Sequence, residues 1–430
     1  MKNICIFLIG FFLNSLLVSS LPEDSPQIWF HPNSESPDFF DLFVKEDQWE
    51  NARNKIDVFQ FYQANVYHQP TNEKITLSRL LDVDAFGKLR AWNISVALEV
   101  GAVKPEPACD PAFTSDSVIQ TIRNIEEHGG YVTYLSMDEP LYAGTIDFGD
   151  ISCGFTLEET ARRTAIFMKT VQAAYPNVLI GDIEVVYPYF KASDIQRWII
   201  ELENNGVTPA FFHYDTDPKG EIVEEDLQIL STFFRERNIP FGVIYHGGVA
   251  DYLDTSEAFF LNNTLWIMKV KKSIPLADHH IFQSWALTTK NEATIPINLP
   301  EYDSTIYSHT RMINEGWAIL MDNDAQFISQ TVPLEMESGK QYPVTITLKN
   351  SGPVSWYGHE GYNLGAQMPT DGLWGLDRVP LDSGEVIAPE QQKTFTFFVT
   401  APWYQDLISF GGACFKKLLN GLEIYAPTYY

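Results

Sequence analysis

The sequence predicts an α/β fold, a (β/α)8 barrel over residues 21–322, followed by a small antiparallel β-sandwich over residues 326–430. Two observations support this prediction. Between Gln27 and about Leu320, eight short runs of β-branched and aromatic residues alternate with longer amphipathic stretches, which is the pattern of repeated βα units. After residue 326, polar and apolar residues alternate between turn-forming clusters, which is typical of antiparallel strands.

The barrel strands are expected where the β-branched and aromatic runs lie, at residues 28–30, 56–62, 94–100, 131–137, 178–185, 210–213, 241–245 and 280–285. Eight units in succession match a closed barrel of the ~250-residue class. A doubly wound open sheet is the alternative architecture. It is disfavoured because no glycine-rich phosphate-binding fingerprint follows the first strand.

Helices are expected in the amphipathic stretches between these strands, at residues 115–127, 157–174, 193–203, 221–237 and 256–271. Two of them have side chains of the N-cap type ahead of an apolar stripe. Thr156 precedes Glu158 and Glu159, and Ser193 precedes Asp194. These residues predict where the second and third of these helices begin.

The first residues have the composition of a secretory signal peptide. Lys2 precedes an apolar run over residues 4–18, and the small residues Ser19 and Ser20 follow it. This order predicts a signal peptide over residues 1–20, with cleavage after Ser20. A membrane anchor is the weaker alternative because the run is shorter than the ~20 residues that a spanning helix needs. We therefore expect a secreted protein without membrane insertion, with an acidic endomembrane compartment left open as its location.

The formal charge of the chain is −27 at pH 7. Such a charge repels phosphate backbones and anionic membranes, so nucleic acid and lipid are disfavoured as partners, whereas neutral glycans are compatible with it. In an oxidising compartment Cys109 and Cys153 can pair. Two tripeptides, beginning at Asn93 and Asn262, match the N-glycosylation sequon. The sequence does not determine the oligomeric state.

Polar groups recur at the ends of the predicted strands, where barrel enzymes place their working residues. Glu99 and Glu184 are the most informative because each lies inside an apolar run, and a buried carboxylate needs a partner or a function. His213 and His246 are expected to hold or tune the acids. The strand-end residues are Glu99, Asp138, Glu139, Asp182, Glu184, His213, Asp215, Asp217, Tyr245, His246, Gln283 and Trp285.

These strand ends suit the cleavage of a glycosidic bond. This reaction needs a carboxylic acid that protonates the leaving oxygen and a second carboxylate that attacks or activates water. Asp138 beside Glu139 offers a general acid, because two crowded acids keep one of them protonated. Flat aromatic side chains at the same end provide surfaces for sugar rings; the candidates are Trp285, Tyr142, Tyr187 and Tyr245.

The segment Asp138-Glu139-Pro140 at the end of the fourth strand resembles the Asn-Glu-Pro motif of the clan A glycoside hydrolases. The resemblance implies that Glu139 is the acid/base and that Trp285, after the eighth strand, stacks on sugar. It covers residues 27 to about 320. Two departures stand out: Asp138 replaces the asparagine, and the seventh strand ends in Tyr245-His246-Gly247-Gly248 where the clan has its nucleophilic glutamate.

The second carboxylate must therefore come from another strand, and Glu184 is the first candidate, with Glu99 the second. The tail resembles immunoglobulin-like, tryptophan-rich domains through Trp356, Trp374 and Trp403. These tryptophans form either a docking surface or part of a sandwich core.

The functional hypothesis is a secreted glycoside hydrolase. The alternative is a non-catalytic glycan-binding or cell-surface protein on a degenerate barrel. An esterase or amidase is disfavoured because the chain has no Gly-x-Ser-x-Gly sequence. We expect no cofactor, and a metal site built from Asp215, Asp217 and a histidine is disfavoured.

Overall fold

The computed structural model describes residues 26–66, 75–104, 109–146, 153–216, 223–248, 255–274, 277–287, 292–301, 307–321, 325–333, 336–352, 355–358, 362–366, 378–401 and 412–415. The predicted signal peptide, Asp217, Trp374 and Trp403 lie outside these residues. None of the helices in the described part is long and apolar enough to cross a membrane.

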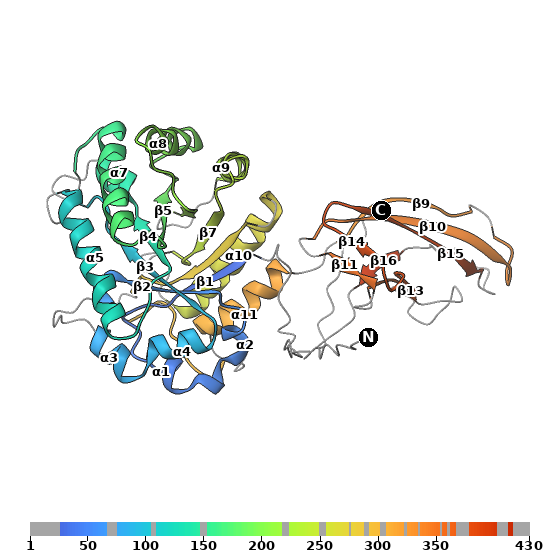
Figure 1. Cartoon of the computed structure of the whole chain (residues 1–430). Helices are drawn as coiled ribbons and strands as arrows, with labels where there is room; N and C mark the ends of the chain where they lie inside the picture. Colours follow the sequence, from blue (N-terminus) through green and yellow to red (C-terminus); the bar gives the residue numbers. More distant parts are fainter. Residues whose placement is uncertain are drawn as a thin grey trace, which may run out of the picture.

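Eight parallel strands close into a barrel (Figure 1). The first strand pairs with both the second and the last, with Phe30 opposite Phe59 on one side and opposite Phe282 on the other. The prediction of a (β/α)8 barrel is confirmed. The strands are β1 Gln27–His31, β2 Val58–Tyr62, β3 Ser95–Val100, β4 Tyr134–Asp138, β5 Leu179–Val185, β6 Phe212–Asp215, β7 Phe241–Tyr245 and β8 His279–Gln283.

A ring of helices surrounds the barrel (Figure 1). Its longer members are α5 Pro111–Glu127, α7 Leu157–Ala174, α8 Ala192–Asn204, α9 Glu224–Glu236, α10 Ser256–Ser273 and α11 His309–Leu320. The shorter helices are α1 Asp41–Val44, α2 Glu50–Arg53, α3 Leu77–Asp82, α4 Ala85–Ala91 and α6 Pro140–Thr145. Their apolar faces pack on the outer face of the strands in one large hydrophobic core.

One of the two predicted helix starts is correct. The Thr156 side chain accepts a hydrogen bond from the Glu159 N–H and caps α7. The prediction that Ser193 caps α8 is wrong, because this helix already begins at Ala192. Lys191 is the residue before the helix, and the carboxylate of Asp194 in the first turn accepts its backbone N–H. This contact is the half of a capping box that the third helical residue supplies.

The interior of the barrel has an apolar layer at its base. Trp29 lies at its centre, with ring contacts to Tyr134, Phe211 and His213 at centroid distances of 5.0, 5.1 and 4.8 Å. Ile183 belongs to this layer and also lines the cavity above it. These side chains fill the base of the barrel, and the cavity lies toward the carboxyl ends of the strands.

A disulfide joins Cys109 and Cys153, as predicted. Cys109 lies between β3 and α5, and Cys153 lies between α6 and α7. The bridge thus ties together the connections that follow two neighbouring strands, β3 and β4. These connections carry Lys104 and Glu139, so the disulfide restrains one side of the mouth of the barrel.

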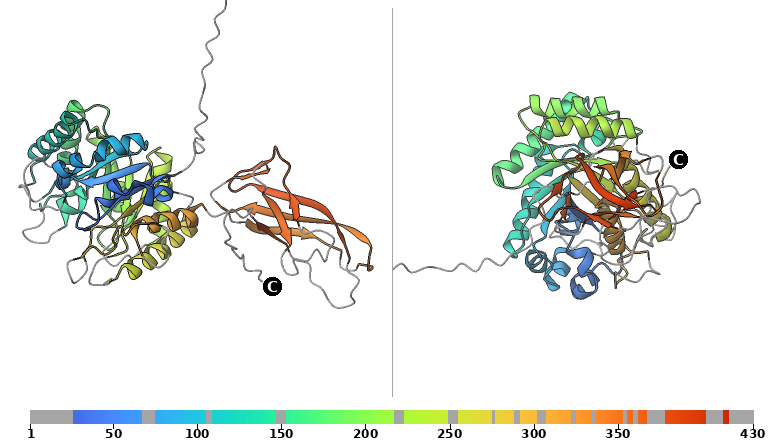
Figure 2. Two further views of the ribbon diagram at one scale, coloured as in Figure 1. Left: turned by 90° about the horizontal axis from the view of Figure 1, so that it is seen from below. Right: turned by 90° about the vertical axis from the view of Figure 1, so that its right-hand side faces the viewer.

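The C-terminal region consists of antiparallel sheets with a separate hydrophobic core (Figure 2). Trp356 is buried in that core, so it serves packing rather than docking. The immunoglobulin-like topology stays a prediction. The strands are β9 Ala325–Thr331, β10 Gln341–Asn350, β11 Trp356–Tyr357, β12 Asn363–Ala366, β13 Arg378–Pro380, β14 Val386–Ile387, β15 Gln392–Thr400 and β16 Gly412–Phe415.

The two sequons differ in their surroundings. Asn93 is exposed at the turn between α4 and β3. Asn262 lies in α10, where its side-chain amide donates to the carbonyl oxygen of Gly247 at 3.2 Å. Asn93 is therefore the more accessible site, and glycosylation at either one stays a prediction.

Candidate active site

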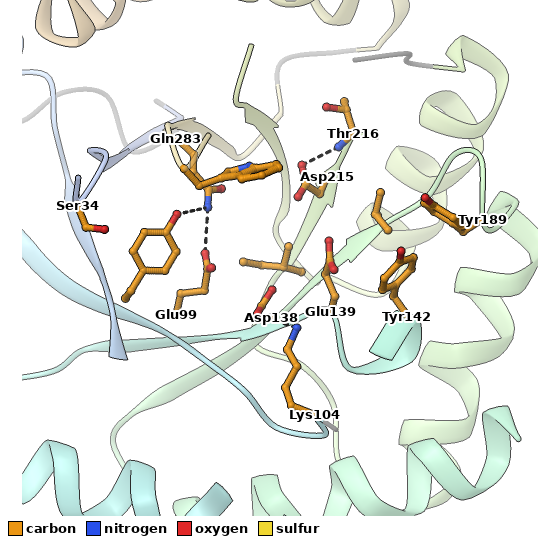
Figure 3. A pocket seen from close by; sticks show the side chains of 14 residues that line it. Ser34, Glu99, Lys104, Asp138, Glu139, Tyr142, Tyr189, Asp215, Thr216 and Gln283 are labelled. Carbon is orange, nitrogen blue, oxygen red and sulfur yellow. Dashed lines mark hydrogen bonds and ion pairs between the residues drawn. The ribbon is translucent and has the colours of Figure 1, made fainter. Parts of the chain in front are cut away.

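A cavity of about 520 Å³ lies at the carboxyl ends of the strands (Figure 3). This volume is in the range of small-molecule sites. Seven residues that the sequence pointed to line it: Glu99, Asp138, Glu139, Tyr142, Asp215, Gln283 and Trp285. Others were missed, namely Ser34, Tyr62, Lys104, Ile183, Val185, Tyr189 and Thr216. Tyr62 ends β2, so the strand-end rule would have found it had it been applied to that strand.

Glu139 is the first residue after β4 and is followed at once by α6. Its backbone is left-handed, with φ 50°, and its N–H donates to the carbonyl of Ile183 on β5 at 3.0 Å. Such a conformation is unfavourable for a residue with a side chain, and it often occurs at functional sites. Here it turns the carboxyl group into the cavity, as Figure 3 shows.

Burial raises the pKa of Glu139 to about 8, with further contributions from the carboxylates of Asp138 and Asp215 and an opposing one from Lys104. At neutral pH the group is therefore mostly a carboxylic acid, able to donate a proton. The prediction that Asp138 and Glu139 together provide a general acid thus has a physical basis in this cavity.

Lys104 approaches the cavity from the segment after β3, and its Nζ lies 2.7 Å from Oδ2 of Asp138 (Figure 3). The carboxylate of Asp138 raises the pKa of Lys104 against the opposing effect of burial, so the lysine stays charged. This pair could not be predicted from the sequence, because a single lysine in a connection forms no pattern.

Asp215 ends β6 and faces the cavity from another wall than Glu139 (Figure 3). Its Oδ1 accepts the N–H of Thr216 at 2.7 Å and lies 3.4 Å from Nε2 of His246. His246 follows β7 and is buried behind these two residues. The end of β7, which carries no carboxylate, therefore supports the carboxylate of β6.

Hydrogen bonds fix the tautomer of His246. Its Nδ1 accepts the N–H of Gly248 at 3.1 Å, so in the neutral ring the proton is on Nε2. That proton faces Thr216: Nε2 of His246 lies 2.7 Å from the hydroxyl oxygen of Thr216 and 3.2 Å from its carbonyl oxygen. Gly247 and Gly248, with φ of 71° and 99°, let the backbone fold back onto the ring.

Aromatic side chains form the remaining walls. Trp285 follows β8 and is 42% exposed beside the cavity, with its ring 5.7 Å from that of His246. Tyr142 and Tyr189 contact each other edge to face at 4.7 Å on another side. An exposed tryptophan ring at a polar cavity is suited to stacking on a sugar.

Known protein-family models do not match the chain, and neither do curated proteins. Solved structures with similar folds include a glucosidase from Croceicoccus marinus, 11% identical, with a TM-score of 0.45 over 87% of this chain and 94% of that one. An α-L-arabinofuranosidase from Thermotoga maritima is 12% identical, with a TM-score of 0.42 over 91% of this chain and 95% of that one.

A GH53 catalytic domain from Ignisphaera aggregans is 13% identical, with a TM-score of 0.39 over 62% of this chain and 86% of that one. Glycoside hydrolases are thus among the structures that resemble this chain. At such identities the likeness concerns the fold, and the chemistry has to be argued from the residues of the cavity.

The prediction of Glu184 as the second catalytic carboxylate does not fit the structure. Side chains alternate along β5, so that Ile183 and Val185 face the cavity and Glu184 faces the helices. Its carboxylate accepts the N–H groups of Leu141 and Tyr142 at the start of α6. Its role is to hold the helix that follows Glu139.

Four predicted substrate-binding residues, Asp182, His213, Tyr245 and His246, do not line the cavity. Asp182 faces outward from β5 and accepts the indole N–H of Trp198 at 2.7 Å. Tyr245 faces outward from β7, and its hydroxyl oxygen lies 2.9 Å from Nδ1 of His280. His213 does face inward, but it lies in the basal layer with its Nε2 3.0 Å from Nδ1 of His279. Tyr187 does not line the cavity either.

The described residues include no cluster of histidine, cysteine and acidic side chains suited to a metal ion. The cavity carboxylates are engaged with Lys104, with Thr216 and with side-chain amides instead.

Burial shifts the pKa of acidic groups and the pKa of histidines in opposite directions. Burial raises the pKa of Asp182 and Glu139 to about 8, and it raises that of Glu99 and Glu184 well above the usual value. Burial lowers the pKa of the buried histidines, to about 3 for His31, His279, His280 and His309, and well below the usual value for His213.

These shifts predict how stability depends on pH. Between about pH 6.5 and 8.5 the carboxyls outweigh the histidines, which lose their remaining protons in the unfolded state over this range. The folded state then holds carboxyl protons that the unfolded state has released, so the free energy of unfolding falls as pH rises. Below about 6.5 the unfolded histidines take up protons, which opposes folding and offsets the carboxyls. Urea midpoints at pH 6.5 and 8.5 test this. Asp182→Asn should reduce the alkaline fall, and an equally steep fall in this variant would contradict the assignment.

Proposed function

We propose that this protein is a glycoside hydrolase that cleaves a poly- or oligosaccharide, with Glu139 as its general acid. The observation that carries the proposal is the state of Glu139: a buried carboxyl with a pKa of about 8, turned into a cavity that also holds Asp138 and Asp215. Glycoside hydrolysis requires an acid that keeps its proton at neutral pH and a second, ionised carboxylate. Here Glu139 is such an acid, and Asp215 on another wall is the second carboxylate.

In this proposal Glu139 gives its proton to the glycosidic oxygen as the bond from that oxygen to the anomeric carbon breaks. Asp215 either attacks the anomeric carbon itself or takes a proton from the water that does so. The N–H of Thr216 and the Nε2–H of His246 face Asp215 and stabilise its ionised form.

Asp138 and Lys104 have an indirect role. The Asp138 carboxylate raises the pKa of Glu139, and the ammonium group of Lys104 limits that rise while it neutralises Asp138. Trp285 offers its exposed ring to a sugar unit. Asp138 and Lys104 thus tune the pKa of the acid, and Trp285 orients the substrate.

Export belongs to the same proposal. The composition of residues 1–20 supports a signal peptide, and the disulfide between Cys109 and Cys153 suits an oxidising compartment. Secretion would bring the enzyme to extracellular glycans.

A panel of neutral polysaccharides and aryl glycosides, incubated with the purified protein between pH 5 and 8, tests the proposal. Release of reducing sugar or of the aryl group from one class of substrate is the expected result. Binding without cleavage would instead favour the glycan-binding protein, an alternative that rests on β7, which contributes no residue to the described lining of the cavity. If the protein neither cleaves any of these substrates nor is retained on glycan columns, both functions are overturned.

A further inference from the structure

One wall of the cavity is a network of uncharged amide groups around Glu99, the next-to-last residue of β3. Oε2 of Glu99 accepts the side-chain N–H groups of Gln60 at 3.0 Å and of Gln283 at 3.1 Å. Gln60 is itself held, because its oxygen accepts the hydroxyl of Ser136 at 2.9 Å. Oε2 is therefore fully engaged, and Oε1 is the oxygen of Glu99 that remains for a ligand.

No cation in the described cavity neutralises Glu99. Lys104 is paired with Asp138 at 2.7 Å. His31 lies 3.5 Å from Oε2, but it is uncharged because burial and His309 lower its pKa to about 3. Burial, together with the carboxylates of Asp138 and Asp215 and against a smaller opposing effect of Lys104, raises the pKa of Glu99 well above its usual value. A buried carboxyl in such surroundings keeps its proton.

Gln283 adds an unused acceptor to the same wall. The residue is 4% exposed and lines the cavity, and its Oε1 has no hydrogen-bond partner in the described structure. Its Nε2 lies 3.5 Å from the hydroxyl of Tyr62, which also lines the cavity (Figure 3). A buried acceptor without a donor is costly, so a bound group that donates to it gains affinity.

We propose that Glu99 binds the substrate as a neutral carboxylic acid, and that Glu99, Gln283 and Tyr62 form a subsite for the hydroxyl groups of an uncharged sugar unit. This inference rests on the proposed function and names its substrate class. A sugar hydroxyl accepts the O–H of Glu99 and donates to Oε1 of Gln283. A uronate carboxylate can only accept and an ammonium group can only donate, so each leaves one partner unsatisfied.

Binding by a Glu139→Gln protein, which is expected to cleave roughly 10²- to 10⁴-fold more slowly, isolates this subsite. Neutral, uronic-acid and amino-sugar oligosaccharides are titrated by calorimetry between pH 6 and 10. We expect the neutral sugars to bind best, with affinity falling at alkaline pH as Glu99 loses its proton. Adding Glu99→Gln, whose amide also donates to the ligand, should preserve binding at pH 6 and remove the alkaline fall. Adding Glu99→Leu should weaken binding roughly tenfold or more.

The outcomes separate this inference from the proposed function. Two results would overturn the neutral acid while leaving the hydrolase in place. In the first, neutral sugars bind, but Glu99→Gln and Glu99→Leu weaken their binding equally. In the second, neutral sugars bind more tightly as pH rises. If no sugar binds, the proposed function fails. The protonation of Glu99 is then read without ligand, as an infrared carboxylic-acid band at neutral pH that Glu99→Gln removes; absence of that band overturns the inference. Thermal midpoints check that each variant is folded.

Discussion

Glu139→Gln is expected to lower kcat by roughly 10²- to 10⁴-fold on the substrate that the protein cleaves, with little change in KM. Glutamine keeps the shape of the side chain and its place at the end of β4, but it has no proton to give to the leaving oxygen. The measurement is steady-state hydrolysis of a substrate with a poor leaving group, since such a substrate depends most on the acid.

The pH profile of the wild-type protein identifies the same group. Only the protonated form of Glu139 can donate, so activity should fall as pH rises through about 8. Asp182→Asn provides a matched control, because Asp182 is also buried with a pKa of about 8 but faces Trp198 outside the cavity. This variant should keep both the rate and the alkaline limb. Loss of that limb in Asp182→Asn, or full activity in Glu139→Gln, would contradict the assignment.

Asp215→Asn is expected to lower kcat by roughly 10²-fold or more, because the amide can neither attack the anomeric carbon nor take a proton from water. His246 is expected to act through Asp215 as a positioning residue. His246→Phe removes the Nε2–H that faces Thr216 and Asp215, whereas His246→Gln places an amide N–H near the same point.

The comparison of the two His246 variants tests this role. His246→Phe should lower kcat and move the acidic limb of the pH profile to higher pH, since the carboxylate loses a donor that stabilises its charge. His246→Gln should restore most of both effects. Equal losses in the two variants, with an unmoved acidic limb, would indicate that the ring matters only for packing against Trp266 and Trp285.

The strand-end prediction succeeded where a residue both faces inward and lies near the carboxyl end of its strand, whereas His213 faces inward but lies in the basal layer. Glu99, Asp215 and Gln283 occupy inward positions on β3, β6 and β8, and all three line the cavity. On β5 the same reasoning chose Asp182 and Glu184, although Ile183 and Val185 face inward. Both faces of a barrel strand are buried, so the apolar pattern of β5 does not reveal which residues point to the axis. That orientation is decided only when the strand pairs with its neighbours.

The sequence by itself determined the alternation of strands and helices and the position of Glu139 at the end of β4, and it allowed the pairing of Cys109 with Cys153. Local periodicity and residue type are sufficient for these features. Tertiary structure alone decided that Glu184 caps α6, that Lys104 pairs with Asp138, and that Glu139 is buried enough to keep its proton. Contacts between segments far apart in the chain, and the exclusion of water from them, exist only once the barrel has closed.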